Sequence, residues 1–206
     1  MKIGIIDYGM GNLFSVEQAL KRLNVDSFIS SDIDELNKSD GLILPGVGAF
    51  PDAMKRLNET KLAEFIVKQT KPLLGICLGM QLLFEKSEEV ALTKGLGIFQ
   101  GHVKRFEGVS RIPHMGWNDL QLVKIPDWLN EKEIPSQTYV YFVHSYYATE
   151  ISRDELVAFA DYEGIKVPGI MAKDNFTGMQ FHPEKSGPFG MFLLDKWLKG
   201  VEQGLC

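Results

Sequence analysis

The most informative stretch of the chain, from Pro72 to Glu85, contains one cysteine between two glycines. Cys77 has Gly75 before it and Gly79 after it, a short apolar run leads into it, and apolar residues at helical spacing follow it as far as Phe84. This Gly-x-Cys-x-Gly spacing is typical of a nucleophile elbow, a sharp strand-to-helix turn that presents a reactive side chain at a sheet edge. A thiol at a helix N-terminus is favoured as the thiolate, the nucleophilic form of cysteine.

Cysteine within an apolar run also has a simpler interpretation, because free cysteine is usually a small buried hydrophobe. The flanking glycines and the predicted change from strand to helix weigh against that interpretation without excluding it. The second cysteine, Cys206, lies at the last position, so the pair offers neither a disulfide framework nor a metal-ligand spacing. We interpret Cys206 as a residue of a frayed terminus without a function.

A histidine and a glutamate near the C-terminus supply what a cysteine nucleophile needs. A base must take the thiol proton, and a third group must hold the tautomer of that base and stabilise its charged form. His182, at the end of a predicted strand, and Glu184, two residues later, can fill these roles. Taken alone, the two residues fit an ion pair on a solvated loop better than a catalytic pair, but the elbow at Cys77 reverses that preference and favours a catalytic triad.

Two glycine-rich turns follow predicted strands, at Gly9–Gly11 and Pro45–Gly48. Neither completes a dinucleotide-binding fingerprint, because Phe14 and Pro51 occupy the positions of the third glycine. Tight strand-to-helix turns are one explanation for both. The alternative for the second is that Gly46 to Gly48 presents backbone N–H groups to an anion, at the sheet edge where parallel strands bind ligands.

Composition excludes several classes of function. With 206 residues, 45% of them hydrophobic, the chain is typical of a soluble globular protein with one core, so we expect a single domain spanning residues 1–206. A net charge of -5 provides no basic field for nucleic acid. The apolar runs are too short to span a membrane and no secretion signal is apparent, so we expect a cytoplasmic protein. His102, His114 and His144 match no metal-site spacing, and we interpret them as hydrogen-bonded structural residues.

Predicted strands and helices alternate in the first half of the chain, which indicates a mostly parallel sheet. From about Gly95, predicted strands follow one another with little helix between them. We therefore expect an α/β fold of three layers, a mostly parallel sheet flanked by helices, with an antiparallel β extension in the C-terminal half. The expected strands are Lys2–Asp7, Ser27–Ile29, Gly41–Leu44, Leu73–Ile76, Gly101–Phe106, Asn118–Val123, Tyr139–His144, Val157–Tyr162, Ile170–Lys173 and Thr177–Phe181. The expected helices are Leu13–Leu23 after an Asn12 cap, Asp34–Asn37, Pro51–Leu57, Leu62–Gln69, Leu78–Phe84 and Phe189–Leu198.

These residues carry a resemblance to a known family. Gly-Ile-Cys-Leu-Gly-Met-Gln around Cys77, together with His182-Pro183-Glu184, resembles the triad of class I glutamine amidotransferases. Further segments resemble one branch, the glutaminase subunits of imidazole glycerol phosphate synthases in histidine biosynthesis. The anthranilate synthase branch usually shows Cys-Leu-Gly-His-Gln and the pyridoxal phosphate synthase branch a Gly-Gly-Glu-Ser loop, and both are absent here. The segments are Ile6–Leu13, Pro45–Phe50, Pro113–Asn118 and Tyr141–Tyr146.

The resemblance implies a mechanism that uses neither a cofactor nor a metal. Cys77 attacks the carboxamide of glutamine while His182 manages the proton, ammonia leaves, and water hydrolyses the glutamyl thioester. The N–H of Leu78 and one from Val47 or Gly48 stabilise the oxyanion. Glutamine contacts are expected from Gln81, Gly48, Ser145 and Tyr146. For Gln81, an ordinary amide on a helix surface is the alternative.

Ammonia in water at pH 7 is largely ammonium, so a glutaminase needs a partner that uses the ammonia directly. The resemblance implies a heterodimer with a (β/α)8-barrel cyclase, whose core conducts ammonia and whose products are imidazole glycerol phosphate and an aminoimidazole carboxamide ribonucleotide. Asn12, Trp117 and Lys185 are the expected interface residues. A buried place in the core is the alternative for Trp117.

Three other functions stay open at this point. A cysteine hydrolase for another amide or ester would turn over without a partner and without preferring glutamine. A non-catalytic binding subunit would be expected to lack a triad member, whereas this sequence has all three. A glutaminase of another synthase would copurify with a different acceptor enzyme.

Overall fold

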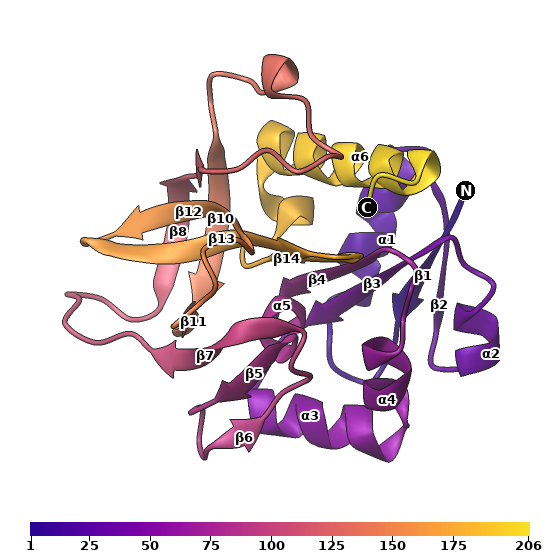
Figure 1. Ribbon diagram of the computed structural model, residues 1–206, viewed down its shortest axis with the longest axis horizontal. Coiled ribbons are helices and arrows are strands. Elements are labelled where there is room, and N and C mark those ends of the chain that lie inside the picture. The colour runs from indigo at the N-terminus through magenta and orange to yellow at the C-terminus, as the bar shows by residue number, and fades with distance from the viewer.

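Helices cover both faces of one large sheet in the computed structural model, which describes residues 1–206 (Figure 1). The strands of this sheet are β1 (Lys2–Ile6), β2 (Asp26–Ser30), β3 (Gly41–Gly46), β4 (Leu73–Cys77), β9 (Gln121–Leu122), β12 (Leu156–Tyr162), β13 (Ile165–Lys173) and β14 (Phe176–Met179). Two smaller sheets contain β8 (His114–Asp119) with β10 (Tyr139–His144), and β11 (Tyr146–Thr149), β7 (Phe99–Arg105), β5 (Phe84–Ser87) and β6 (Thr93–Lys94). The helices are α1 (Leu13–Arg22), α2 (Ile33–Leu36), α3 (Phe50–Glu59), α4 (Leu62–Val67), α5 (Leu78–Leu82) and α6 (Gly187–Gln203), with short 3-10 turns η1 (Glu131–Glu133) and η2 (Pro183–Lys185).

The strand order of the large sheet is β2-β1-β3-β4-β14-β13-β12-β9. The first five strands in that order are mutually parallel, and the last three are added antiparallel. The expected α/β fold with an antiparallel extension is confirmed. Although β14 comes late in the chain, it pairs with β4. The segment after β14 therefore lies beside the turn that follows β4.

Strands β3 and β4 send alternate side chains into two separate hydrophobic cores, as strands buried on both faces do. Ile43 and Leu74 pack in the core that α1 and α6 cover. Leu42 and Leu73 pack in the opposite core, beneath α3 and α4 (Figure 1). The N-terminus of α1 is capped as expected, since the side chain of Asn12 accepts a hydrogen bond from the main-chain nitrogen of the third helical residue at 3.3 Å.

Besides the antiparallel extension of the large sheet, the C-terminal half contributes strands to both smaller sheets. Tyr139–His144 is a strand as expected, but it pairs only with β8. The strand expected over Asn118–Val123 is divided in two, because β8 ends at Asp119 and the chain passes buried Leu120 before it enters β9 in the large sheet. Strand β13 begins earlier than expected, because Glu163 and Gly164 both have positive φ and form a tight hairpin turn.

The helix after Cys77 was expected to reach Phe84 but ends at Leu82. Phe84 instead begins β5, where its ring packs against Phe99 at a centroid distance of 5.4 Å and the two residues pair in parallel strands. Tertiary pairing overrides the helical spacing here. The C-terminus is also more ordered than expected, since the Cys206 thiol donates to the Trp197 carbonyl at 3.5 Å and packs against the core of α1 and α6.

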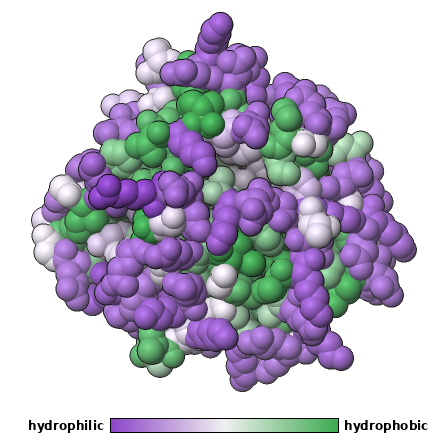
Figure 2. Space-filling model, viewed as in Figure 1, coloured by the Kyte–Doolittle hydropathy of each residue, from purple (hydrophilic) through white to green (hydrophobic).

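The face shown in Figure 2 is mainly hydrophilic, with hydrophobic residues in scattered patches. None of the helices combines the length and the apolar character needed to cross a membrane.

Strands β3 and β4 and helix α5 cross so closely that only glycine fits between them. A Cβ on Gly79 would lie 1.9 Å from the carbonyl oxygen of Leu44, and a Cβ on Gly75 would lie 2.8 Å from the carbonyl oxygen of Gly79. Both neighbours are backbone atoms, which cannot move aside without distorting the sheet. The two glycines flanking Cys77 are therefore required by packing.

We expect Gly79→Ala to lower the free energy of unfolding by about 3 kcal/mol, the upper end of the usual cost of overpacking, because the methyl group collides with backbone. Urea unfolding measures the loss. Gly108→Ala is the matched control: its added Cβ meets nothing within 4 Å, and only its positive φ costs about 1 kcal/mol. Equal losses in the two variants would contradict the close crossing.

Candidate active site

Cys77 occupies the turn between β4 and α5 that the sequence predicts. Its backbone has φ 55 and ψ -112, a conformation that costs a non-glycine residue about 1–3 kcal/mol. The residue is 8% exposed, and it both packs in the core that α1 and α6 cover and lines a pocket. The simple interpretation of Cys77 as a buried hydrophobe is therefore insufficient.

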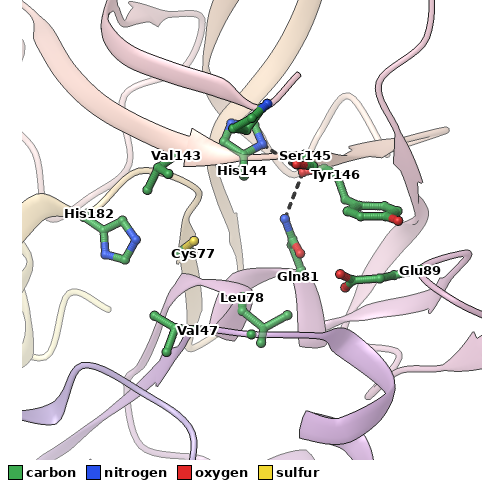
Figure 3. Close-up of a pocket in the computed structure, with 12 residues that line it drawn as sticks. Val47, Cys77, Leu78, Gln81, Glu89, Val143, His144, Ser145, Tyr146 and His182 are labelled. Atoms are coloured by element: carbon green, nitrogen blue, oxygen red, sulfur yellow. Dashed lines mark hydrogen bonds between the residues drawn. The ribbon is translucent and has the colours of Figure 1, made fainter. Parts of the chain in front are cut away.

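The pocket at this turn has a volume of about 390 Å³, within the range of small-molecule sites. It lies at the carboxyl ends of β3 and β4 and beneath the connection from β10 to β11 (Figure 3). No cluster of three or more His, Cys, Asp or Glu side chains forms a candidate metal site. The lining residues are Val47, Gly48, Cys77, Leu78, Gln81, Glu89, Pro113, Val143, His144, Ser145, Tyr146 and His182.

His182 reaches this pocket because β14 runs parallel to β4, with Met179 paired to Ile76. The chain continues past both strand ends, and the His182 ring faces the Cys77 sulfur (Figure 3). The Nδ1 atom of His182 lies 2.8 Å from Oε1 of Glu184, and both side chains are buried. The structure thus brings the three residues of the predicted triad together, in the order thiol, imidazole, carboxylate.

The imidazole of His182 is held in its charged form. Burial by itself would lower the pKa of His182, but the interactions with Cys77 and Glu184 outweigh burial and raise it to about 10. The arrangement therefore places one positive charge beside the Cys77 thiol.

The loop that carries His182 is anchored to β10. The hydroxyl of Ser186 donates to the His182 carbonyl at 2.7 Å and accepts from the Tyr141 main-chain nitrogen at 2.9 Å. A guanidinium nitrogen of Arg22 lies 3.5 Å from the Glu184 carbonyl oxygen. These contacts limit the orientations that the imidazole can adopt.

The residues expected to supply oxyanion donors, Val47, Gly48 and Leu78, also line the pocket. Val47 and Gly48 donate to no main-chain carbonyl in the protein, so their N–H groups are available to a ligand. Leu78 is the first residue of α5, where an N–H has no partner within the helix. All three residues line the pocket with Cys77, as expected from the sequence.

Gln81 is buried beside the nucleophile at 5% exposure, so the alternative of an ordinary surface amide is wrong. Its Nε2 donates to the Tyr146 carbonyl at 2.9 Å (Figure 3) and to Oε1 of Gln180 at 3.0 Å. Ser145 and Tyr146 line the pocket from the connection between β10 and β11. The expected glutamine contacts are therefore grouped at one pocket.

The sequence analysis did not assign Glu89, His144 or Gln180 to this site. Glu89 follows β5 and directs its carboxylate toward the pocket beside Gln81 (Figure 3), and burial raises its pKa. His144 lines the pocket as well, although it is also the hydrogen-bonded structural residue expected. Gln180 follows β14, and its Nε2 lies 3.9 Å from the Cys77 sulfur.

Two neutral histidines back the pocket. Nδ1 of His144 lies 2.8 Å from the Tyr146 carbonyl, and its Nε2 lies 3.2 Å from Nδ1 of His114. Burial lowers the pKa of His144 to about 3 and that of His114 to about 4. His182 is therefore the charged imidazole of this site at neutral pH.

The expected interface residues lie at the surface near the loop of His182. Trp117 is 57% exposed, so the alternative of a core position is wrong. Its ring lies beside Gly187 at the start of α6 and at 5.9 Å from the Tyr141 ring. Lys185 is exposed on η2, and the partly exposed Asn12 caps α1.

Comparison of the sequence with known proteins identifies the family of the chain. A family profile described as "Glutamine amidotransferase class-I" matches residues 4–201. The chain belongs to the class I glutamine amidotransferases.

Curated relatives of this class I glutamine amidotransferase are similar over nearly its whole length. "Imidazole glycerol phosphate synthase subunit HisH" of Geobacillus thermodenitrificans (strain NG80-2) is 49% identical, with 98% of this chain and 97% of that protein covered. The protein of the same name from Shouchella clausii (strain KSM-K16) is 53% identical, with 97% and 99% covered. The similarity thus includes both the elbow and the His182 segment.

Solved structures agree in fold. A structure described as "Crystal structure of glutamine amidotransferase" aligns with a TM-score of 0.75 at 18% identity and covers 97% of this chain and 98% of that chain. "Structure of PurLQS from Thermotoga maritima" aligns with a TM-score of 0.76 at 19% identity and covers 100% and 99%. Both confirm the class I glutamine amidotransferase fold of the chain.

The raised pKa of His182 predicts a pH dependence of stability. The unfolded value is about 6.5, so the stabilising contribution is complete below that pH and is lost as the pH rises through about 10. Between these limits, the free energy of unfolding of the wild-type protein should fall by at least about 1 kcal/mol more than that of His182→Gln. Urea titrations across the window measure both slopes.

His102→Gln is the control for this experiment. Burial lowers the pKa of His102, so its contribution does not titrate in the alkaline range, and this variant should follow the wild-type slope. Parallel slopes for wild type and His182→Gln would contradict a charged His182.

Proposed function

We propose that this chain is the glutaminase subunit of an imidazole glycerol phosphate synthase in histidine biosynthesis, and that residues 1–206 form a single glutaminase domain. The observation that carries the proposal is the identity of 49% and 53% to HisH subunits over nearly the whole of each chain. The thiol, imidazole and carboxylate at one pocket support it, because they supply the chemistry that a glutaminase needs.

In the proposed reaction the Cys77 thiolate attacks the carboxamide carbon of glutamine. The carbon–nitrogen bond breaks as His182 donates its proton to the leaving nitrogen, which departs as ammonia and leaves a glutamyl thioester. His182, now neutral, takes a proton from water as the water attacks the thioester, and glutamate leaves with the thiolate restored. Glu184 holds the tautomer of His182 through Nδ1 and stabilises its charged form.

The oxyanion of each tetrahedral intermediate needs donors aimed at the reacting carbon. The proposed donors are the N–H group of Leu78 and one from Val47 or Gly48, and the absence of a main-chain acceptor for the latter two supports this role. Losing one such donor typically costs about 3 to 4 kcal/mol of transition-state stabilisation. The rate therefore depends on how the loop after β3 is oriented.

The amino-acid end of glutamine is proposed to lie between Gln81 and Glu89. Both hydrogens of the Gln81 amide are donated within the protein, so its oxygen is left to accept from the ammonium group of the substrate. The Glu89 carboxylate supplies a negative charge at the same place. Gly48, Ser145 and Tyr146 complete the proposed contacts.

An exposed apolar face on the sheet of β8 and β10 supports a partner that covers the pocket. Met115, Trp117 and Val143 point to the same side of this sheet, because the first two are two residues apart and Val143 pairs with Met115. They are 46%, 57% and 36% exposed. Val143 also lines the pocket, so this face is continuous with the pocket entrance.

We propose that this face, with Asn12 and Lys185 at its margin, contacts a cyclase subunit in a heterodimer. A (β/α)8-barrel cyclase would receive ammonia at the pocket and use it to form imidazole glycerol phosphate and an aminoimidazole carboxamide ribonucleotide. Direct transfer keeps ammonia from becoming ammonium in water. The names of the curated relatives, each a subunit of a synthase, support a partner of this kind.

Cys77→Ala should lower glutamine-dependent synthesis by the complex with the cyclase by at least about a thousandfold, because the thioester cannot form. Synthesis from added ammonia should continue at the wild-type rate, since the cyclase is intact. Product formation with each nitrogen source measures both. Cys206→Ala, which alters the other cysteine, is the control and should retain both activities; a glutamine-dependent rate that survives Cys77→Ala would refute the nucleophile.

Glu89→Gln should raise KM for glutamine about ten- to a hundredfold with a smaller effect on kcat, because the lost charge faces the non-reacting end of the substrate. In the wild-type protein the Glu89 carboxylate accepts a hydrogen bond from the Phe50 main-chain nitrogen at 2.8 Å. The side-chain amide oxygen introduced by Glu89→Gln can still accept this bond, so the fold should be preserved. Glu88→Gln is the control, because Glu88 is exposed and does not line the pocket, and it should leave KM unchanged. An unchanged KM in Glu89→Gln would contradict the proposed ammonium contact.

A further inference from the structure

Gln180 is a buried polar side chain that neither the proposed triad nor the proposed oxyanion donors use. It follows β14 and is 1% exposed. Its main-chain nitrogen donates to the Gly169 carbonyl at 2.9 Å, so pairing with β13 needs nothing from the side chain. The side-chain Nε2 lies 3.9 Å from the Cys77 sulfur, and Oε1 lies 3.0 Å from Nε2 of Gln81.

The orientation of these two amides follows from one main-chain carbonyl. The Tyr146 oxygen can only accept, and it accepts from Nε2 of Gln81. That places the NH2 end of Gln81 toward Tyr146 and leaves its second hydrogen for Gln180. The acceptor end of Gln180 must then face Gln81, because two NH2 groups cannot bond to one another.

Gln180 therefore presents its own NH2 end to the sulfur. A rotation of its amide by half a turn would place an oxygen lone pair against the thiolate and a donor against a donor. Both contacts are unfavourable in a buried site, where an unpaired polar group costs about 1–3 kcal/mol. We call the hydrogen-bonded series of Tyr146, Gln81 and Gln180 the amide relay. It has one stable arrangement, in which the NH2 group of Gln180 faces Cys77.

We propose that Gln180 is a positioning residue for the glutaminase reaction: it directs an amide N–H at the Cys77 sulfur and holds Gln81 in the orientation that binds glutamine. The inference rests on the proposed function and extends it to a residue outside the triad. A donor to the charged form favours the thiolate. Because the relay begins at Tyr146, on the segment proposed to bind glutamine, displacement of that segment disturbs the nucleophile as well.

The first test measures the nucleophile without glutamine or partner. In a Cys206→Ala background, Cys77 is the sole thiol, and its rate of alkylation by iodoacetamide at neutral pH reports the thiolate fraction. Gln180→Met keeps the length of the side chain and removes both polar ends, so the rate should fall about five- to tenfold. Gln180→Glu should lower it further, because an ionised carboxylate offers the sulfur no donor and also repels the thiolate.

Gln69→Met is the matched control, since Gln69 bonds to the Phe65 carbonyl at 3.2 Å and does not line the pocket; its alkylation rate should equal that of the parent. Gln81→Met should also slow alkylation, although Gln81 is not bonded to the sulfur, because Gln180 is then free to rotate. Thermal unfolding checks that each variant is folded. If Cys77 is alkylated at the parental rate in a folded Gln180→Met or Gln81→Met protein, the relay is overturned.

The second test uses the complex with the cyclase. Gln180→Met should raise KM for glutamine and lower kcat, each several-fold, because the relay acts on both Gln81 and Cys77. Unchanged kcat and KM in this variant would overturn the inference. A wild-type complex without glutaminase activity would instead refute the proposed function, whereas the alkylation rates would still decide the relay.

Discussion

The parallel pairing of β14 with β4 is the contact on which the rest of the site depends. It carries His182 from the end of the chain to the turn that exposes Cys77. Side chains alternate along a strand, so a slip of one residue would turn the imidazole to the other face of the sheet and leave the thiol without a base. The two hydrophobic cores, one on each face, oppose such a slip, because it would also exchange every side chain between them.

The electrostatic character of the pocket follows from what each imidazole touches. His182 bonds to the carboxylate of Glu184 and faces a thiol, so its charged form is stabilised even though it is buried. His144 touches a main-chain carbonyl and the imidazole of His114, and burial keeps both neutral. The site therefore concentrates one positive charge beside Cys77, the proposed nucleophile, and none beside the amide that is proposed to contact glutamine.

Several features that cost stability lie within or next to this pocket. Cys77 has positive φ, the Oε2 atom of Glu184 is buried without a hydrogen bond, and the Tyr8 hydroxyl is buried without one beside Gly46. The sheet of β8 and β10 leaves an apolar face exposed at the pocket entrance. Such features are retained where chemistry or a partner needs them, and the well-filled cores on both faces of the sheet offset their cost.

Local sequence patterns were enough to predict most individual strands and helices and the turn that carries Cys77. The period of the apolar residues determined most strands and helices of the first half, and the glycines around Cys77 determined the elbow, because only glycine fits where β3, β4 and α5 cross. The identities of Cys77, His182 and Glu184 were readable because their chemistry is complementary. Tertiary structure alone decided that Glu89 and Gln180 join the site, that Phe84 is a strand residue, and that Gln81 is buried while Trp117 is exposed. These outcomes depend on which segments far apart in the chain pack together, and local spacing carries no information about that.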